Sequence, residues 1–149
     1  MLPASGNRLR LSISLCTLAL PLLLTGCFGT IIEGQKEAPK LEAAMHEQMA
    51  KGDLAGIYDN ADPGYKSAMT REKSDALFSA ISRKLGAPTS CKAGGTNVVA
   101  TPSGTTITAT CETIFSKNAT GVETFNWRKS GDKYRLFGYH INSNELIER

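Results

Sequence analysis

The chain has 149 residues, of which 41% are hydrophobic and 21% are charged, with 14 glycines and 6 prolines. This length allows one small domain, and the composition is that of a globular protein rather than a disordered or collagen-like one. Seventeen basic and fourteen acidic residues give a formal charge of +3. A dedicated nucleic-acid binder carries a much larger, clustered basic excess, so nucleic acid is not an expected partner.

Residues 1–26 have the pattern of a secretory signal peptide. Residues 1–10 contain Arg8, Arg10 and no acidic residue, and Leu11–Leu24 is an apolar run of 14 residues. A membrane-spanning helix needs about 20 such residues, so this run is too short to span a bilayer comfortably. A basic segment, a short apolar run and small residues after it are typical of secretory signals. The alternative, an N-terminal core helix, is disfavoured because Pro21 interrupts the run.

The end of the apolar run carries Leu24-Thr25-Gly26-Cys27, which resembles the lipobox of bacterial lipoproteins. The resemblance implies that the Cys27 thiol receives a diacylglyceryl group and that the signal peptide is cut before this residue. Two or three acyl chains anchor a protein stably, because each buried CH₂ contributes about 0.8 kcal/mol. Phe28 stands where Asp is associated with inner-membrane retention, so the resemblance favours the outer membrane, facing the periplasm. The alternative is ordinary signal cleavage that leaves the Cys27 thiol free.

The apparent basicity of the chain belongs mostly to the targeting segment. Without Arg8 and Arg10, the mature chain Cys27–Arg149 has 15 basic and 14 acidic residues, a net charge of +1. A charge this small provides no strong field to steer nucleic acid or to hold anionic lipid headgroups.

Four cysteines are present, and two of them remain once targeting is accounted for. Cys16 lies in the apolar run of the signal peptide, and Cys27 is the predicted lipid site. Cys91 and Cys111 form an even pair in an oxidising compartment, which predicts a disulfide. A bridge closing the 19 intervening residues contributes about 3 kcal/mol in the chain-entropy model. The alternatives are two free thiols or a metal site helped by the chain's two histidines, His46 and His140; no metal or cofactor is expected.

The mature chain is expected to begin with a lipidated tether, residues 27–38, followed by one α+β domain over residues 39–149. Three helices are predicted: Pro39–Lys51, Leu54–Tyr58 and Arg71–Leu85. Asp53 and Thr70 precede the second and third helices as N-caps, and residues 60–64 read as a turn cluster. The apolar face expected for the first helix is Leu41, Ala44, Met45, Gln48 and Met49.

After Pro88 the composition shifts to Thr, Val, Ile and aromatic residues broken by Gly, Ser and Asn. Four or five strands are predicted, near Thr89–Ala93, Thr96–Thr101, Thr105–Ser116, Val122–Lys129 and Tyr134–Asn142. Short turns between the later strands suit hairpins. Alternation places Phe125 with Trp127 on one face, and Phe137 with Tyr139 and Ile141. Helices followed by an antiparallel meander indicate an α+β fold.

This order of elements resembles the nuclear-transport-factor-2-like, or ketosteroid-isomerase-like, superfamily and its uncharacterised lipoprotein domains. The matching segments are Gly52-Asp53-Leu54 and Leu136-Phe-Gly-Tyr-His-Ile-Asn-Ser-Asn144. The resemblance covers residues 39–146 and implies a curved sheet wrapped round helices, an open-ended cavity and frequent dimerisation through the sheet. It implies no single activity, because enzymes and binding modules share this scaffold.

A catalytic reading needs a base, a positioned partner and an oxyanion donor. The side chains weighed for it are Asp53, Tyr58, Asp59, Tyr134, Tyr139 and His140. Asp53 is explained as a helix cap, Asp59 belongs to a turn region, and His140 faces outward if its neighbour Tyr139 faces inward. No catalytic residue is therefore assigned. Candidate cavity-lining residues are Tyr58, Phe125, Trp127, Phe137 and Tyr139.

These observations predict a lipid-anchored protein of the cell envelope whose domain is a non-enzymatic binding or accessory module. Its expected partners are the membrane, through the anchor, and a small apolar ligand, another envelope protein or a second copy of the chain. An aromatic-lined cavity favours a ligand, and an exposed apolar sheet face favours a protein. The alternatives are an isomerase- or dehydratase-type enzyme with Tyr139 as hydrogen-bond donor, or an inhibitor or accessory of an envelope enzyme.

Overall fold

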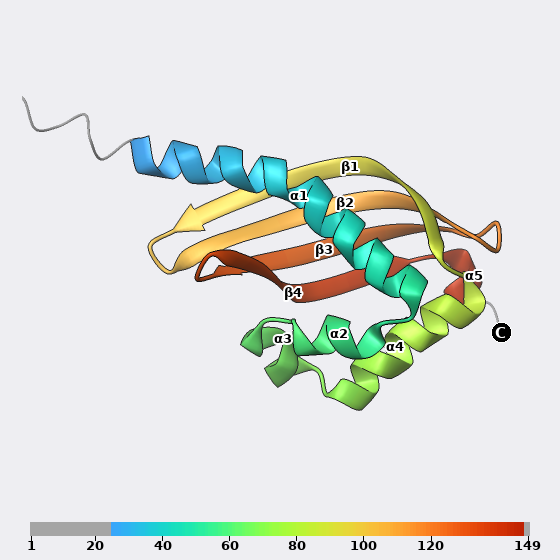
Figure 1. Ribbon diagram of the computed structural model, residues 1–149. Coiled ribbons are helices and arrows are strands. Elements are labelled where there is room, and N and C mark those ends of the chain that lie inside the picture. The colour runs from blue at the N-terminus through green and yellow to red at the C-terminus, as the bar shows by residue number, and fades with distance from the viewer. Residues whose placement is uncertain (1–24, 148–149) are drawn as a thin grey trace, which may run out of the picture.

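The computed structural model in Figure 1 describes residues 25–147, with side chains from residue 29 onward. The predicted signal peptide up to residue 24 and the side chain of Cys27 lie outside the described residues. The elements in chain order are α1 (Thr25–Lys51), α2 (Leu54–Asp59), α3 (Pro63–Ala68), α4 (Arg71–Lys84), β1 (Pro88–Thr101), β2 (Gly104–Phe115), β3 (Thr120–Ser130), β4 (Lys133–Asn142) and α5 (Asn144–Ile147). The predicted α+β class is confirmed.

The four strands form one antiparallel meander in the order β1-β2-β3-β4, which leaves β1 and β4 as edges of an unclosed, curved sheet. Helix α1 crosses one face of the sheet against β1 and β2, and α2, α3 and α4 lie beyond its C-terminal end (Figure 1). Side chains on the helix-facing side of the sheet are buried, whereas the opposite side carries exposed and half-buried residues. The core therefore lies between this inner face and the helices.

The predicted caps are confirmed. The Asp53 side chain accepts a hydrogen bond from the Gly56 N–H at the start of α2, and the Thr70 hydroxyl accepts one from the Lys73 N–H at the start of α4. Gly52 follows α1 at a φ of +71°, a backbone conformation that glycine adopts without strain. These local signals mark the same boundaries in the sequence and in the fold.

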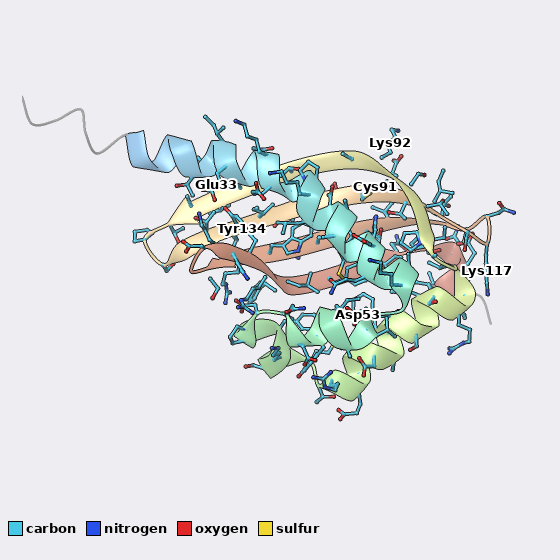
Figure 2. The ribbon with its side chains drawn as sticks, in the orientation of Figure 1. Glu33, Asp53, Cys91, Lys92, Lys117 and Tyr134 are labelled. Carbon is cyan, nitrogen blue, oxygen red and sulfur yellow. A yellow bond between two sulfur atoms is a disulfide. The ribbon has the colours of Figure 1, made fainter. Side chains whose placement is uncertain are left out.

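Helix α1 is 27 residues long and begins at Thr25, well before Pro39, so the whole segment expected to be a tether, residues 27–38, is helical. It approaches β1 so closely that a Cβ on Gly34 would lie 2.7 Å from Val98 Cγ1. Lys129 on β3 also pairs with Glu33 at 2.7 Å, and Figure 2 shows Glu33 and Tyr134 at the same end of the molecule. Packing against the sheet thus sustains a helix that sequence periodicity did not indicate.

The apolar face expected for the first helix is also rotated. Met45 and Met49 are buried as predicted, but Ala44 is exposed and Glu42 is buried. The buried side of α1 in the described residues runs through Gly34, Ala38, Glu42, Met45 and Met49. A glutamate outside the predicted face therefore occupies a buried position on α1.

Two further differences concern the turn cluster and the strands. Residues 63–68 form α3, whose N-cap Asp62 accepts from the Gly64 N–H at 2.7 Å, and the Asp62 N–H donates to the Leu136 carbonyl of β4. β1 is one strand rather than two, with a register shift between Ala93 and Gly95. Bulges accommodate one extra residue without ending a strand, which explains the apparent break in the pattern.

Candidate functional site

Glu123 on β3 is a fully buried carboxylate. It alternates with Phe125 and Trp127, so its side chain points from the sheet toward the helices. An ionised carboxylate inside a protein is costly unless hydrogen-bond donors surround it. Its presence in the core is therefore a departure from apolar packing that needs compensating partners.

Three side chains from different elements supply those partners. His46 Nε2 on α1 lies 2.6 Å from Glu123 Oε2, and the same oxygen accepts a hydrogen bond from the Thr113 hydroxyl on β2. The Tyr139 hydroxyl on β4 donates to Glu123 Oε1 at 2.6 Å. We call these four residues the Glu123 network. A carboxylate only accepts hydrogen bonds when ionised, and both of its oxygens are used here.

Tyr139 is held as a donor by this arrangement. Burial, followed by the negative charge of Glu123 and the hydrogen bond to it, raises the pKa of the Tyr139 hydroxyl well above its ordinary value. The hydroxyl therefore stays protonated at neutral pH and donates a hydrogen bond to Glu123. A tyrosine has one hydroxyl hydrogen, so Tyr139 has none left to donate to a substrate.

The network lies beneath an open depression between α1 and the start of β1, which we call the α1–β1 pocket. Its volume is about 430 Å³. It is lined by Pro39, Glu42, Ala43, His46, Pro88, Thr89, Ser90, Cys91 and Ala93. His46 connects the two features, because its ring lines the pocket and also contacts Glu123. Its side chain is 13% exposed.

Glu42 is the second acidic residue of the site and lies one helical turn before His46. It is only 5% exposed. Burial raises the pKa of the Glu42 carboxyl, the charge of His46 opposes this, and the charge of Glu123 adds to it. Among the described residues, no hydrogen bond or ion pair reaches the Glu42 carboxylate. Because the pKa is raised, the folded state favours the protonated form of Glu42. Glu42 therefore stabilises the fold at low pH, and this contribution is lost as pH rises through the folded-state pKa.

The predicted disulfide between Cys91 and Cys111 is confirmed, with a Cα–Cα distance of 5.6 Å. It joins the edge strand β1, where Figure 2 labels Cys91, to β2. Cys91 is exposed and lines the pocket, whereas Cys111 is fully buried near Thr113 of the Glu123 network. The bridge thus ties one wall of the pocket to the sheet beneath it.

Three of the predicted cavity-lining residues come together, but as packed core. Phe125 and Trp127 stack with ring centroids 5.1 Å apart, and Tyr139 lies 5.3 Å from Phe125 and 5.0 Å from Phe78. Phe125 and Trp127 are buried and Tyr139 is half-buried. These rings contact one another in the space between the sheet and the helices.

The other two predicted lining residues, Tyr58 and Phe137, lie elsewhere. Tyr58 on α2 packs edge-on against Tyr65 and lies beneath the Arg71 guanidinium. Phe137 is the extra residue of a bulge, because Gly138 pairs with Asn126 and Leu136 with Trp127. The Phe137 side chain therefore does not share a face with Tyr139 and Ile141 as predicted. Its ring centroid lies 3.6 Å from the Arg128 guanidinium carbon.

The remaining catalytic candidates do not converge. Asp53 caps α2, Asp59 pairs with Arg71, and His140 is exposed on the side of β4 opposite to Tyr139. Tyr134 lies near Glu33, with the Lys129 amine 5.6 Å from its ring centroid. In the part of the chain that the structure describes, no group of three or more His, Cys, Asp or Glu side chains is arranged to hold a metal ion.

Sequence reasoning missed Glu42 and Glu123 as site residues and considered His46 only as a metal ligand. The available signal for Glu123 was its place in the alternation with Phe125 and Trp127, which puts a charge on an apolar face. His46 and Glu42 are four residues apart, a spacing that places both on one side of a helix. No local sequence pattern indicates that His46 on α1 contacts Glu123 on β3.

No protein-family model matches the chain, and no curated protein matches it. Among residues 25–147, no helix combines the length and the apolar character needed to cross a membrane.

Proposed function

We propose that this chain is a lipid-anchored protein of the cell envelope and that its domain is a non-enzymatic binding module with its ligand site in the α1–β1 pocket. The observation that carries the binding proposal is the Glu123 network beneath this pocket. Four side chains from α1, β2, β3 and β4 hold one another in place there. Such a buried polar network is costly to assemble and rigidifies its surroundings, as a binding site requires.

The anchoring proposal rests on the resemblance of Leu24-Thr25-Gly26-Cys27 to a lipobox and on its position after a short apolar run. The structure adds two exposed residues, Ile31 and Ile32, in α1. They follow Cys27 by four and five residues, about 6–8 Å along a helix. Exposed apolar side chains this close to an acylated residue suit contact with the membrane surface.

The enzymatic alternative depended on Tyr139 as a free donor to substrate. Its hydroxyl already donates its one hydrogen bond to Glu123. His46 is engaged with the same carboxylate through Nε2. Because both groups are used in holding the site together, we favour binding over isomerase-type chemistry as its function.

Replacing Cys27 with serine tests the anchor. The variant keeps the signal peptide but loses the sulfur that accepts the diacylglyceryl group, so we expect the mature protein to move from the membrane to the soluble fraction. The measurement is fractionation of intact cells, with mass spectrometry of the acylated N-terminus of the wild type. Replacing Cys16 with serine is the matched control and should leave the protein in the membrane. Retention of the Cys27→Ser variant in salt-washed membranes would contradict lipid anchoring.

Filling the pocket tests the binding site. Ala43 is exposed and lines the pocket, so a tryptophan there occupies its volume without entering the core. We expect Ala43→Trp to weaken the binding of pocket-directed small molecules at least tenfold, measured by NMR titration with a fragment library. Ala55→Trp, at an exposed position on α2, is the control and should bind as the wild type does. Fragment binding that is unchanged in Ala43→Trp would place the ligand site elsewhere.

A further inference from the structure

The α1–β1 pocket contains a carboxyl group that no cation in the described part of the chain contacts. Its ionisable lining residues are Glu42 and His46, and no lysine or arginine is among the described residues that line it. His46 faces the buried Glu123, so any positive charge on its ring is matched within the network. Glu42, by contrast, is more than nine-tenths buried and has no hydrogen-bond or ion-pair partner among the described residues.

The nearest lysines along the chain do not supply that missing partner. Lys40 on α1 pairs with Glu37 at 2.6 Å. Lys92, next to Cys91 on β1, pairs with Glu112 at 3.2 Å and is 82% exposed, and Figure 2 shows it projecting outward from the strand. The protein therefore places an uncompensated carboxylate in the wall of an open pocket. The ionised form of such a group is stabilised when a ligand supplies its counter-charge.

The other lining residues define what that ligand looks like. Thr89 donates its hydroxyl hydrogen to the Ile114 carbonyl at 2.9 Å, which leaves its oxygen free to accept. Ser90 pairs with the exposed Ile114 and shares the outer face of β1 with Lys92, so its side chain is not counted among the acceptors. A primary ammonium group has three N–H donors, which matches the two oxygens of one carboxylate and one hydroxyl oxygen.

The rest of the wall is small and apolar. Pro39, Ala43, Pro88 and Ala93 face the same space, whose volume of about 430 Å³ falls within the range of roughly 300–1,000 Å³ found for small-molecule sites. Such walls suit a short hydrocarbon body attached to the charged group. An anion is disfavoured by Glu42, and a purely apolar ligand would leave the carboxylate without a partner.

We infer that the α1–β1 pocket binds a small primary organic ammonium ion, with Glu42 as its counter-ion and the hydroxyl of Thr89 as a further acceptor. This inference rests on the proposed function, because it assigns a ligand class to the same pocket. It replaces the apolar ligand expected from the sequence with an amphipathic cation. The Glu123 network positions His46 at the floor of the pocket and does not itself contact the ammonium group.

The test uses three probes of nearly equal size: n-butylammonium, 1-butanol and butyrate. Each is titrated into the mature lipidated chain in detergent micelles, and binding is followed by NMR chemical shifts at neutral pH. We expect saturable binding of one n-butylammonium per chain, and affinity at least tenfold lower for 1-butanol and for butyrate. Saturable shifts should include residues of the pocket wall.

Glu42→Gln keeps the shape of the side chain and removes its charge. We expect it to weaken n-butylammonium binding at least tenfold while its thermal unfolding shows an intact fold. Glu47→Gln, on the exposed side of the same helix, is the matched control and should bind as the wild type does. Equal affinity for 1-butanol and n-butylammonium would overturn the ammonium assignment while leaving the pocket as a binding site. Unchanged n-butylammonium binding in Glu42→Gln, or no saturable binding, would also overturn it.

Discussion

Glu123→Ala is expected to lower the free energy of unfolding by about 3–5 kcal/mol, the cost found when one partner of a buried ionic pair is removed. The substitution leaves His46, Thr113 and Tyr139 without their shared acceptor at a position that is fully buried. It also leaves a cavity where the side chain was. Urea denaturation followed by circular dichroism measures this loss.

Glu112→Ala is the matched control for this prediction. Glu112 lies on the neighbouring strand β2 but is exposed on the other face of the sheet, where it pairs with Lys92. Exposed ion pairs contribute about 0–1 kcal/mol, so the control should change stability little. If Glu123→Ala lost no more stability than Glu112→Ala, the Glu123 network would not be the structural basis of the pocket floor.

Phe125→Ala is expected to lower the free energy of unfolding by about 3–5 kcal/mol, because truncating a buried aromatic residue removes its apolar contacts and leaves a cavity. Phe125 is fully buried and packs against the rings of His46, Trp127 and Tyr139. Chemical denaturation measures the change, and a near-ultraviolet spectrum reports on the packing around Trp127.

Val122→Ala provides the comparison for Phe125→Ala on the same strand. Val122 points to the opposite face of β3 and is 47% exposed, so its truncation removes little buried surface. We expect it to cost less than about 1 kcal/mol, well below the effect of Phe125→Ala. A small loss for Phe125→Ala would instead indicate that Phe125 lines a space that a ligand fills, which is the cavity-lining role predicted from the sequence.

Local chemistry explains why much of the fold was predictable. Asp53 and Thr70 can satisfy free N–H groups at helix starts whatever the rest of the chain does. Strict alternation along β2 and β3 likewise indicates which residues face the helices. Cys91 and Cys111 were paired by elimination, and their place on neighbouring antiparallel strands confirms the bridge. Each of these features depends either on a few residues close in sequence or on the number of cysteines left in the mature chain.

The functional site was less accessible because its members are far apart in the chain. His46 and Glu123 are 77 residues apart, and only the packing of α1 on the sheet brings them within hydrogen-bond distance. Glu42 lies outside the face that the sequence predicted to be buried, and glutamates are almost never fully buried without a partner. A binding site departs from such averages, so sequence patterns describe it least well.

The sequence by itself determined the α+β class, the helix caps, the inward face of the strands and the disulfide, since these follow from local hydrogen bonding, side-chain alternation and cysteine pairing. Only the tertiary structure decided that α1 continues through Gly34 and Pro39, that Phe137 leaves its strand pattern in a bulge, and that two glutamates face inward. The physical reason is that contacts between α1 and the sheet compensate for weak helix signals and for buried charge. Neither compensation is visible until distant segments are packed together.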